Sequence, residues 1–368
     1  MPRKRIRKSK DSFVAFDDHL TNGKVIGMVN VGGDPTKKYE GGLTKNMKKF
    51  AIQGADGSVK DVFFKSIFDD SFIYKGNFLR MEMKGKKGHI TLNDMENNPL
   101  SKDDHMYLET QLRDKNVPYG KKKEIFDSHK GWMVNRELAS LALGKMLKMD
   151  HLPEGSIREI TTRKPNGESM QELGFVSENL VQKLAEDGAI IKTGVETVGG
   201  LGDNGIFDNI AATDKKFGDK ILFDYLIGNT DRHQNNFFAK RTQQAGKTHY
   251  EMLGFDHGLS FGKSNKDTLN NIYYGFNGQA GPAVQLKYQS QFTTVTKEFV
   301  NAVNDVINDF YDNNGGKFKE LTDFIEQKIG KNESDSFKDR FADVVEGLLA
   351  NNDKNADSII RAASKCYV

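Results

Sequence analysis

The chain has 368 residues, 37% of them hydrophobic and 29% charged, and a formal net charge of +3. This length exceeds one ordinary compact core and predicts a bilobal body or two domains. No apolar run approaches the roughly 18 to 20 residues that cross a bilayer, and the basic start lacks the apolar stretch of a secretory signal peptide. A single cysteine, Cys366, excludes an internal disulfide and disfavours structural zinc, so we expect a globular protein of the cytoplasm.

Positive charge is unevenly distributed along the chain. Residues 1–12 form a basic tail, for which a nuclear-localisation or membrane-surface role is an alternative to plain solubility. Lys and Arg gather in the first 130 residues, whereas the last 60 are comparatively acidic. This asymmetry indicates a side of the molecule that faces a polyanion.

Strands are predicted at the start of the chain. Residues 24–31, 47–53 and 59–67 predict three antiparallel strands, and a glycine-bracketed loop at 32–42 follows the first. The dipeptide Asp56-Gly57 predicts the turn between the second and the third. Residues 70–130 then predict an irregular, lysine-rich insertion with a short helical stretch near 106–112.

A helix and a hairpin follow the insertion. Residues 134–149 have the apolar periodicity of an amphipathic helix. Residues 156–163 and 170–180, separated by the turn P-N-G, predict two arms of a hairpin. Beyond them the pattern becomes helical, with an apolar helix at 220–228 and three or four amphipathic helices after about residue 295. The fold class is therefore α+β, with a strand-rich first lobe at 13–180 and a helical second lobe at 181–368.

Two short motifs in the second lobe have the oxygen ligands that phosphoryl transfer needs: metal ligands near the phosphates and a carboxylate near the acceptor hydroxyl. In D-R-H-Q-N-N, Asp231 precedes Asn236 by five positions, the offset of Asp and Asn in the kinase loop H-R-D-L-x-x-x-N. Twenty residues later, D-H-G begins at Asp256, where a kinase has D-F-G. The segments N-F-F-A-K and Y-E-M-L-G-F-D predict hairpin arms that bring Asn236 and Asp256 to the same end. The plain alternative is a helix cap with a surface turn at N-T-D-R-H.

Together, D-Y-L-I-G-N-T-D-R-H-Q-N-N and F-D-H-G-L-S-F resemble the catalytic region of phosphatidylinositol 3- and 4-kinases and of HipA-type bacterial protein kinases. The close match covers residues 222–261. The resemblance implies a bilobal protein-kinase-like fold that uses ATP and Mg²⁺ (or Mn²⁺). It implies that Asp231 is the catalytic aspartate, and that Asn236 and Asp256 are the metal ligands. It also implies that Arg232 and His233 brace the loop or the transferring phosphate.

The kinase hypothesis makes demands on the first lobe. Lys65 lies on the third predicted strand, where a kinase lysine would pair with the α- and β-phosphates. Glu137 resembles the glutamate of the corresponding helix in HipA-type kinases and is the candidate partner of Lys65; an ordinary first-turn acid is the alternative. About 70 residues separate the two, more than a short loop and helix require, and Glu109 is a fallback partner.

Nucleotide contacts are predicted at two further places. The glycines of the 32–42 loop, Gly33 among them, are candidates to cover the phosphates, although G-x-G-x-x-G is missing and plain turns are the alternative. The end of the 170–180 strand predicts a hinge, where backbone groups near Glu178 to Leu180 reach adenine.

The acceptor and partners are less defined. Lysines at 37, 38, 45, 48, 49, 84, 86, 87 and 121–123 predict either a solvated face or a site for a phosphoinositide, an inositol polyphosphate or an acidic protein. Nucleic acid is not expected. After D-H-G, only Lys263 and Lys266 are available to hold a lipid headgroup, which favours a Ser or Thr of a protein as acceptor. A phosphoinositide kinase, a pseudokinase scaffold and an AMP-transferring enzyme are the alternatives, and a bacterial effector delivered to a host cytosol would suit the sequence.

Overall fold

In the computed structural model, the described residues make up most of the chain. They are 18–29, 48–67, 79–84, 87–92, 111–112, 114, 116–128, 130–163, 168–184, 189–193, 205–229, 232, 236–262, 294–351 and 355–364. Among the helices in these ranges, none combines the length and apolar character that crossing a membrane requires.

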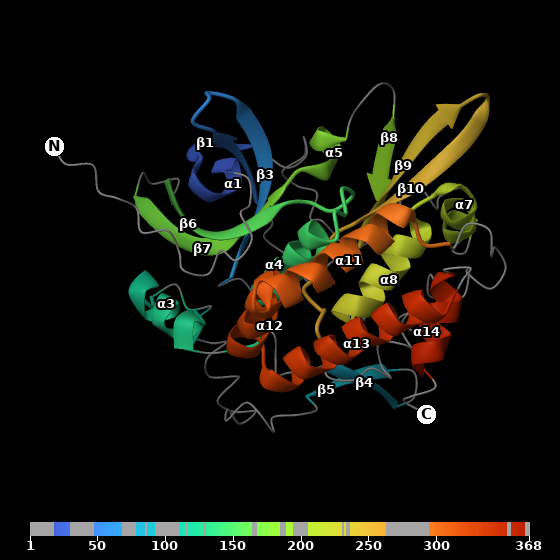
Figure 1. Cartoon of the computed structure of the whole chain (residues 1–368). Coiled ribbons are helices and arrows are strands. Elements are labelled where there is room, and N and C mark those ends of the chain that lie inside the picture. The colour runs from blue at the N-terminus through green and yellow to red at the C-terminus, as the bar shows by residue number, and fades with distance from the viewer. Residues whose placement is uncertain are drawn as a thin grey trace.

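A curled antiparallel sheet forms the first lobe (Figure 1). Its strand order is β1-β2-β3-β7-β6. The strands are β1 (Lys24–Val29), β2 (Lys48–Gln53), β3 (Val59–Ser66), β6 (Gly155–Arg163) and β7 (Ser169–Glu178). The three predicted N-terminal strands and the later hairpin are confirmed, and all pair antiparallel. Because β3 pairs directly with β7, the long segment between them leaves the sheet and returns to it.

The two faces of this sheet pack against different helices. Phe64 and Val176 belong to a small core on one face together with Leu20 of α1 (Asp18–Asn22). Phe175 belongs to the large core shared with α4 (Met133–Met146) and the second lobe. Lys65 stands opposite Phe175 in the β3–β7 pair, and opposed residues share a face. The side chain of Lys65 is therefore on the face that looks toward α4.

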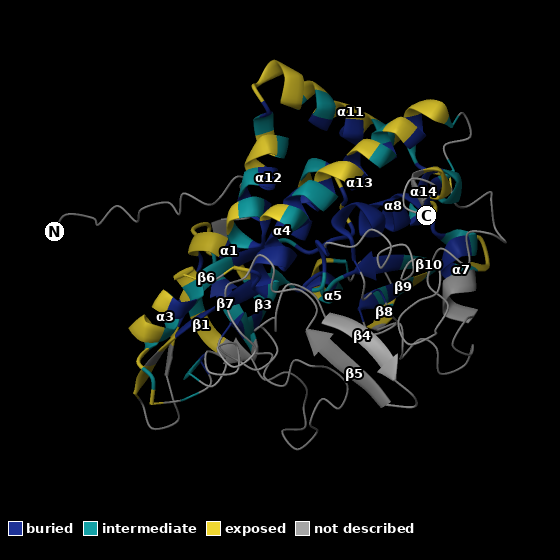
Figure 2. Ribbon diagram, turned by 90° about the horizontal axis from the view of Figure 1, so that it is seen from below, coloured by how far each residue is buried: buried dark blue, intermediate teal, exposed yellow. Residues whose placement is uncertain are grey.

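Helix α4 confirms the predicted helix, but it is not amphipathic. All residues from Val134 to Gly144 are buried. The helix packs between β6 and α12 (Gly316–Lys328), and in Figure 2 it is mostly dark blue. A helix with partners on both sides has no solvent face, so its polar residues are buried with the apolar ones.

Helices dominate the second lobe. The predicted C-terminal helices are α11 (Lys297–Asp312), α12, α13 (Lys331–Ala350) and α14 (Ala356–Ser364). Helices α13 and α14 pack on α8 (Phe217–Ile227), every residue of which is buried. Figure 2 shows that α11 and α13 expose only their outer faces. The predicted apolar helix at 220–228 and the amphipathic helices after residue 295 are thus confirmed.

Several elements lie where the sequence predicted none. The 70–130 segment was predicted to be irregular, yet it contains the paired strands β4 (Leu79–Lys84) and β5 (Lys87–Leu92) and the helix α3 (Tyr119–Ser128). The prediction of an irregular insertion is therefore wrong for these stretches. Helices α5 (Leu180–Lys183) and α7 (Gly205–Thr213), by contrast, lie where the pattern was predicted to become helical.

A second sheet stands at the edge of the helical lobe. Its strands are β8 (Ile190–Thr193), β9 (Phe237–Gln244) and β10 (Lys247–Gly254), all antiparallel. Figure 1 shows the β9–β10 hairpin as a long gold ribbon that projects past α7. The predicted α+β class, with an antiparallel-sheet first lobe and a mostly helical second lobe, is confirmed.

Candidate active site

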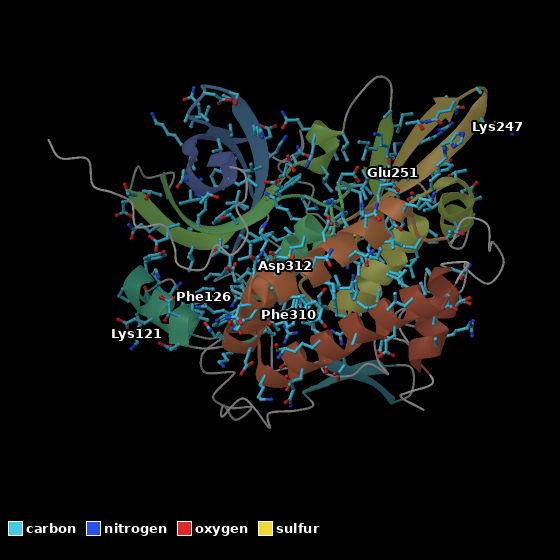
Figure 3. The ribbon with its side chains drawn as sticks, in the orientation of Figure 1. Lys121, Phe126, Lys247, Glu251, Phe310 and Asp312 are labelled. Carbon is cyan, nitrogen blue, oxygen red and sulfur yellow. The ribbon has the colours of Figure 1, made fainter. Side chains whose placement is uncertain are left out.

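The β9–β10 hairpin brings the two sequence motifs together. Ala245 and Gly246, with φ of +49° and +76°, form its two-residue turn, and the strands pair without a bulge. Beyond the last pair, the Phe255 N–H donates to the Asn236 carbonyl at 3.1 Å. Asn236 and Asp256 therefore lie at the same end of the hairpin, as the sequence predicted. In Figure 3, Lys247 marks its opposite, outer tip.

Arg232 clamps this end of the hairpin. Its side chain is 4% exposed, and Nε and Nη2 donate to the two carboxylate oxygens of Asp224 at 2.9 and 3.0 Å. Its Nη1 donates to the Phe255 carbonyl at 2.8 Å and also to the Asn236 carbonyl. One guanidinium thus ties the last turn of α8 to both strand ends. Of the two roles expected for Arg232, this geometry corresponds to bracing the loop.

Asp224, the partner of Arg232, was missed from the sequence. It is 3% exposed, and Asn229 Nδ2 donates to its Oδ1 at 2.9 Å. Helix α8 ends at Gly228, whose φ of +60° suits glycine, and the Asn229 N–H then donates to the Asp224 carbonyl. The available signal was a lone acid inside an apolar helix, eight positions before an arginine.

The D-H-G segment begins with a constrained backbone. Asp256 has φ of +56°, a left-handed conformation that Asp tolerates better than most residues. Its Oδ1 lies 3.6 Å from Lys65 Nζ. The carboxylate is 31% exposed and the lysine 16% exposed. The fold therefore joins the third-strand lysine of the first lobe to the D-H-G aspartate of the second.

Glu137 is attached to the next residue of the same segment. The His257 N–H donates to Glu137 Oε2, and His257 Nδ1 lies 3.4 Å from Oε1. The ring of His257 is fully buried and packs edge-on against Phe223 at 5.9 Å. The sequence predicted that Glu137 positions Lys65. The structure shows both side chains linked to neighbouring residues of D-H-G, and a direct contact between them stays a prediction.

The predicted hinge lies between the two lobes along the chain. Glu178 is the last residue of β7; its N–H donates to the Glu154 carbonyl and its carboxylate accepts from Lys183 at 2.8 Å. Leu180 begins α5 and is buried, with Asn179 capping the helix. The Glu178 N–H and the carbonyls of Asn179 and Leu180 are bonded within the fold. The expectation that backbone groups near Glu178 to Leu180 reach adenine stays a prediction.

Two titratable groups near the base of α8 have shifted pKa values. Burial raises the pKa of Asp219 to about 6, against the opposing effect of hydrogen bonds from the Thr296 N–H and hydroxyl at 2.8 and 2.7 Å. Burial lowers the pKa of His151, and the nearby cation of Lys220 lowers it further. Arg232 and His257 also contribute to lowering the pKa of His151, so this cluster is electrostatically linked to the site.

Some predicted site residues lie outside the described ranges. They are Asp231, His233 and Gly33, with the fallback Glu109, the 32–42 loop, the basic tail and the segment at 263–293. Their roles stay predictions. In the part of the chain that is described, no group of three or more His, Cys, Asp or Glu side chains is arranged to hold a metal.

Comparison with known proteins gives similarity only at the level of three-dimensional structure. No protein-family model and no curated protein matches the chain. Among similar solved structures is that of the Golgi casein kinase, with 12% identity, a TM-score of 0.39, and coverage of 95% of this chain and 76% of that chain. Another is the Helicobacter pylori proinflammatory kinase CtkA, with 11% identity, a TM-score of 0.34, and coverage of 87% and 95%. These scores reflect a distant likeness.

Proposed function

We propose that this chain is a kinase that uses ATP with Mg²⁺ or Mn²⁺ and transfers the γ-phosphate to Ser or Thr hydroxyls of a protein. One arrangement supports the proposal: the hairpin sets Asn236 and Asp256 at one end, and Lys65 Nζ lies 3.6 Å from Asp256 Oδ1. Phosphoryl transfer depends on positioning and on charge stabilisation, and a lysine beside a metal-binding aspartate supplies both.

The donor set fits a hard divalent cation. Asp256 offers a carboxylate that is partly open to solvent, and Asn236 offers an amide oxygen. Mg²⁺ is usually held by one or two protein ligands together with substrate phosphates and water. When bound, the cation would neutralise charge that develops on the phosphates. The left-handed backbone of Asp256 costs about 1 kcal/mol or more and supports a functional constraint at this residue.

The side chains around the metal site would have distinct tasks. Lys65 would hold the α- and β-phosphates, as in V-A-I-K of protein kinases. Glu137 accepts the His257 N–H and would thereby orient Asp256. Asp231 would accept the proton of the attacking hydroxyl. In this proposal His233 supports the same loop, Gly33 belongs to the loop over the phosphates, and the backbone from Glu178 to Leu180 contacts adenine.

The acceptor is proposed from the sequence. The two lysines that follow D-H-G, Lys263 and Lys266, are few for a lipid headgroup, which favours a protein hydroxyl. The finer resemblance, to phosphatidylinositol 3- and 4-kinases and HipA-type kinases, rests on residues 222–261. Three further hypotheses also rest on the sequence alone. They are a polyanion bound at the lysines of the first lobe, a cytoplasmic location, and delivery into a host cell.

Label transfer from ATP separates the competing activities. We expect γ-labelled ATP with Mg²⁺ to label Ser or Thr of generic acceptor proteins, and α-labelled ATP to leave them unlabelled. Label in phosphatidylinositol vesicles alone would indicate a lipid kinase, and transfer of the α-label an AMP-transferring enzyme. Saturable MgATP binding without transfer would indicate a pseudokinase, and the absence of ATP binding would refute the proposal.

A pair of matched variants controls this experiment. Asp256→Asn keeps the shape of the side chain but removes the negative charge of the one carboxylate proposed to hold the cation, so it should abolish transfer. Asp127→Asn makes the same change at an exposed residue of α3 and should leave transfer at the wild-type rate. Equal activity of the two variants would exclude Asp256 as the metal ligand.

A further inference from the structure

Two fully buried arginines from different helices converge on residues 260–262, which begin two positions after D-H-G. Arg136 on α4 is 1% exposed and Arg340 on α13 is 0% exposed. Arg136 Nη1 donates to the carbonyl oxygens of Ser260 and Phe261 at 2.6 and 2.7 Å. Arg340 Nη1 donates to the Gly262 carbonyl at 3.4 Å. Both guanidinium groups therefore bind main-chain carbonyls in the interior, and neither contributes charge to the protein surface.

Arg340 also holds the end of α8, from which the predicted catalytic loop leaves. Its Nε donates to the Leu226 carbonyl at 3.0 Å, while the Phe261 N–H donates to the Ile227 carbonyl. A Cβ added at Gly228 would lie 2.8 Å from Arg340 Nη2, so glycine at this position admits the guanidinium. The two motif-bearing segments are thus joined to each other and to one arginine of α13.

An anion accompanies the two arginines. Glu333, in the first turn of α13 and fully buried, has its Oε1 3.7 Å from Arg136 Nη2. Buried ion pairs add little to stability compared with apolar side chains of the same size, because removing the charges from water is costly. Apolar side chains could not, however, hold backbone carbonyls in a fixed direction. The buried charges therefore indicate that the direction of these carbonyl groups has to be fixed.

The backbone that the arginines hold is itself unfavourable. Phe261 has φ of +56°, which aromatic residues rarely adopt. Such a conformation persists only where the surroundings determine it. Its ring is fully buried and packs edge-on against Phe337 of α13 at 5.5 Å. The chain path just after the metal-site segment is therefore set by α4 and α13 together.

We propose that Arg136 and Arg340 are positioning residues of the phosphotransfer reaction. They fix the exit of the D-H-G segment against the end of α8, and so hold Asp256 and the segment after it in the reactive arrangement. In this proposal both act through the backbone that they hold and not by contact with nucleotide or acceptor. The catalytic consequence rests on the proposed function, whereas the fixed backbone does not.

Arginine-to-lysine variants test the proposal. Arg136→Lys and Arg340→Lys keep the charge and the aliphatic stem but lose the planar guanidinium. In Arg340 this group reaches two carbonyls through Nε and Nη1, and in Arg136 it serves two carbonyls through Nη1 while Nη2 faces Glu333. The matched control is Arg158→Lys, because Arg158 also donates to two carbonyls, those of Leu20 and Gly23, away from D-H-G. Each variant is measured by hydrogen exchange of peptides over 255–262 and 297–312, by thermal unfolding and by steady-state phosphotransfer kinetics.

We expect exchange over 255–262 to accelerate about tenfold or more in both variants while 297–312 stays at the wild-type rate. We also expect kcat to fall about 10- to 100-fold with the KM for ATP within about twofold. Arg158→Lys should lower the melting temperature without either change. Unchanged exchange over 255–262, or equal acceleration over 297–312, would overturn the proposal. If exchange accelerates locally in the variants but the wild-type protein transfers no phosphate, the arginines still fix the backbone and the proposed function is refuted.

Discussion

Replacing Arg232 with lysine tests whether a single guanidinium holds the end of the hairpin. Arg232 donates to both carboxylate oxygens of Asp224 and to the carbonyls of Asn236 and Phe255. Lysine keeps the charge, but its ammonium group is a point donor on a flexible stem and cannot span this fork. We expect lysine to keep its ion pair with the Asp224 carboxylate and to lose both bonds to the carbonyls of Asn236 and Phe255.

The size of the effect follows from the bonds lost. A hydrogen bond with a charged partner contributes about 1.5–3 kcal/mol net, so two contribute about 3–6 kcal/mol. Water that enters the site would form new hydrogen bonds with the two carbonyls and compensate part of this energy. We therefore expect the free energy of unfolding to fall by about 3 kcal/mol. A domain with about 5–15 kcal/mol of stability would stay folded. A displacement of the metal ligands by about 1 Å would lower kcat about 100-fold.

Denaturant unfolding and phosphotransfer kinetics measure the two effects separately. Arg241→Lys is the control, because Arg241 is an exposed arginine of β9 in the same hairpin. Its free energy of unfolding should stay within about 0.5 kcal/mol of wild type. Wild-type stability and kcat in Arg232→Lys would refute the clamp. Lost stability with an unchanged kcat would refute its effect on the metal ligands.

Three further predictions concern charged side chains. Asp256→Ala should abolish metal-dependent ATP binding, whereas Asp231→Ala should bind ATP and lose transfer, as calorimetry and label transfer measure; wild-type transfer by the Asp231 variant would contradict its role. Lys65→Met should raise the KM for ATP about tenfold or more, and an unchanged KM would exclude the phosphate contact. Because burial raises the pKa of Asp219 to about 6 from 3.8, the folded state binds more protons than the unfolded state between these values. The free energy of unfolding should therefore fall by about 2 kcal/mol as the pH rises from 4 to 6. Asp219→Asn should lose this slope in denaturant titrations, and an identical slope in the variant would assign it to other groups.

Local patterns account for the parts of the fold that could be predicted. Strands β1 to β3 and the β6–β7 hairpin follow from period-two alternation and from turn residues, which act over a few positions. The four-residue strand β8 gave no such signal, since its ladder is formed with β9, more than 40 residues later. The burial of α4 on all sides depends on α12, which the sequence of α4 does not contain.

The residues of the candidate site also differ in whether local sequence or tertiary contacts determine their positions. Asn236 and Asp256 could be placed together because one hairpin controls their separation. The Asp224–Arg232 pair is local as well and could have been found by asking what an acid does inside an apolar helix. Arg136 and Arg340 could not be found, because the groups they bind come from residues more than 75 positions away. An arginine in a helical pattern is normally a surface residue, and only tertiary contacts show that these two are buried.

The sequence distances between the site residues also have a physical explanation. In an antiparallel hairpin, residues on the two strands stay opposed however long the strands are, so the interval from Asn236 to Asp256 reflects strand length and the turn at Ala245-Gly246. The long interval from Lys65 to Glu137 appeared to oppose a shared site. It contains β4, β5 and α3, and β3 nevertheless pairs directly with β7, so the insertion leaves the sheet intact. Both intervals are therefore compatible with one site, because strand pairing places Lys65, Asn236 and Asp256, and the packing of α4 against β6 places Glu137.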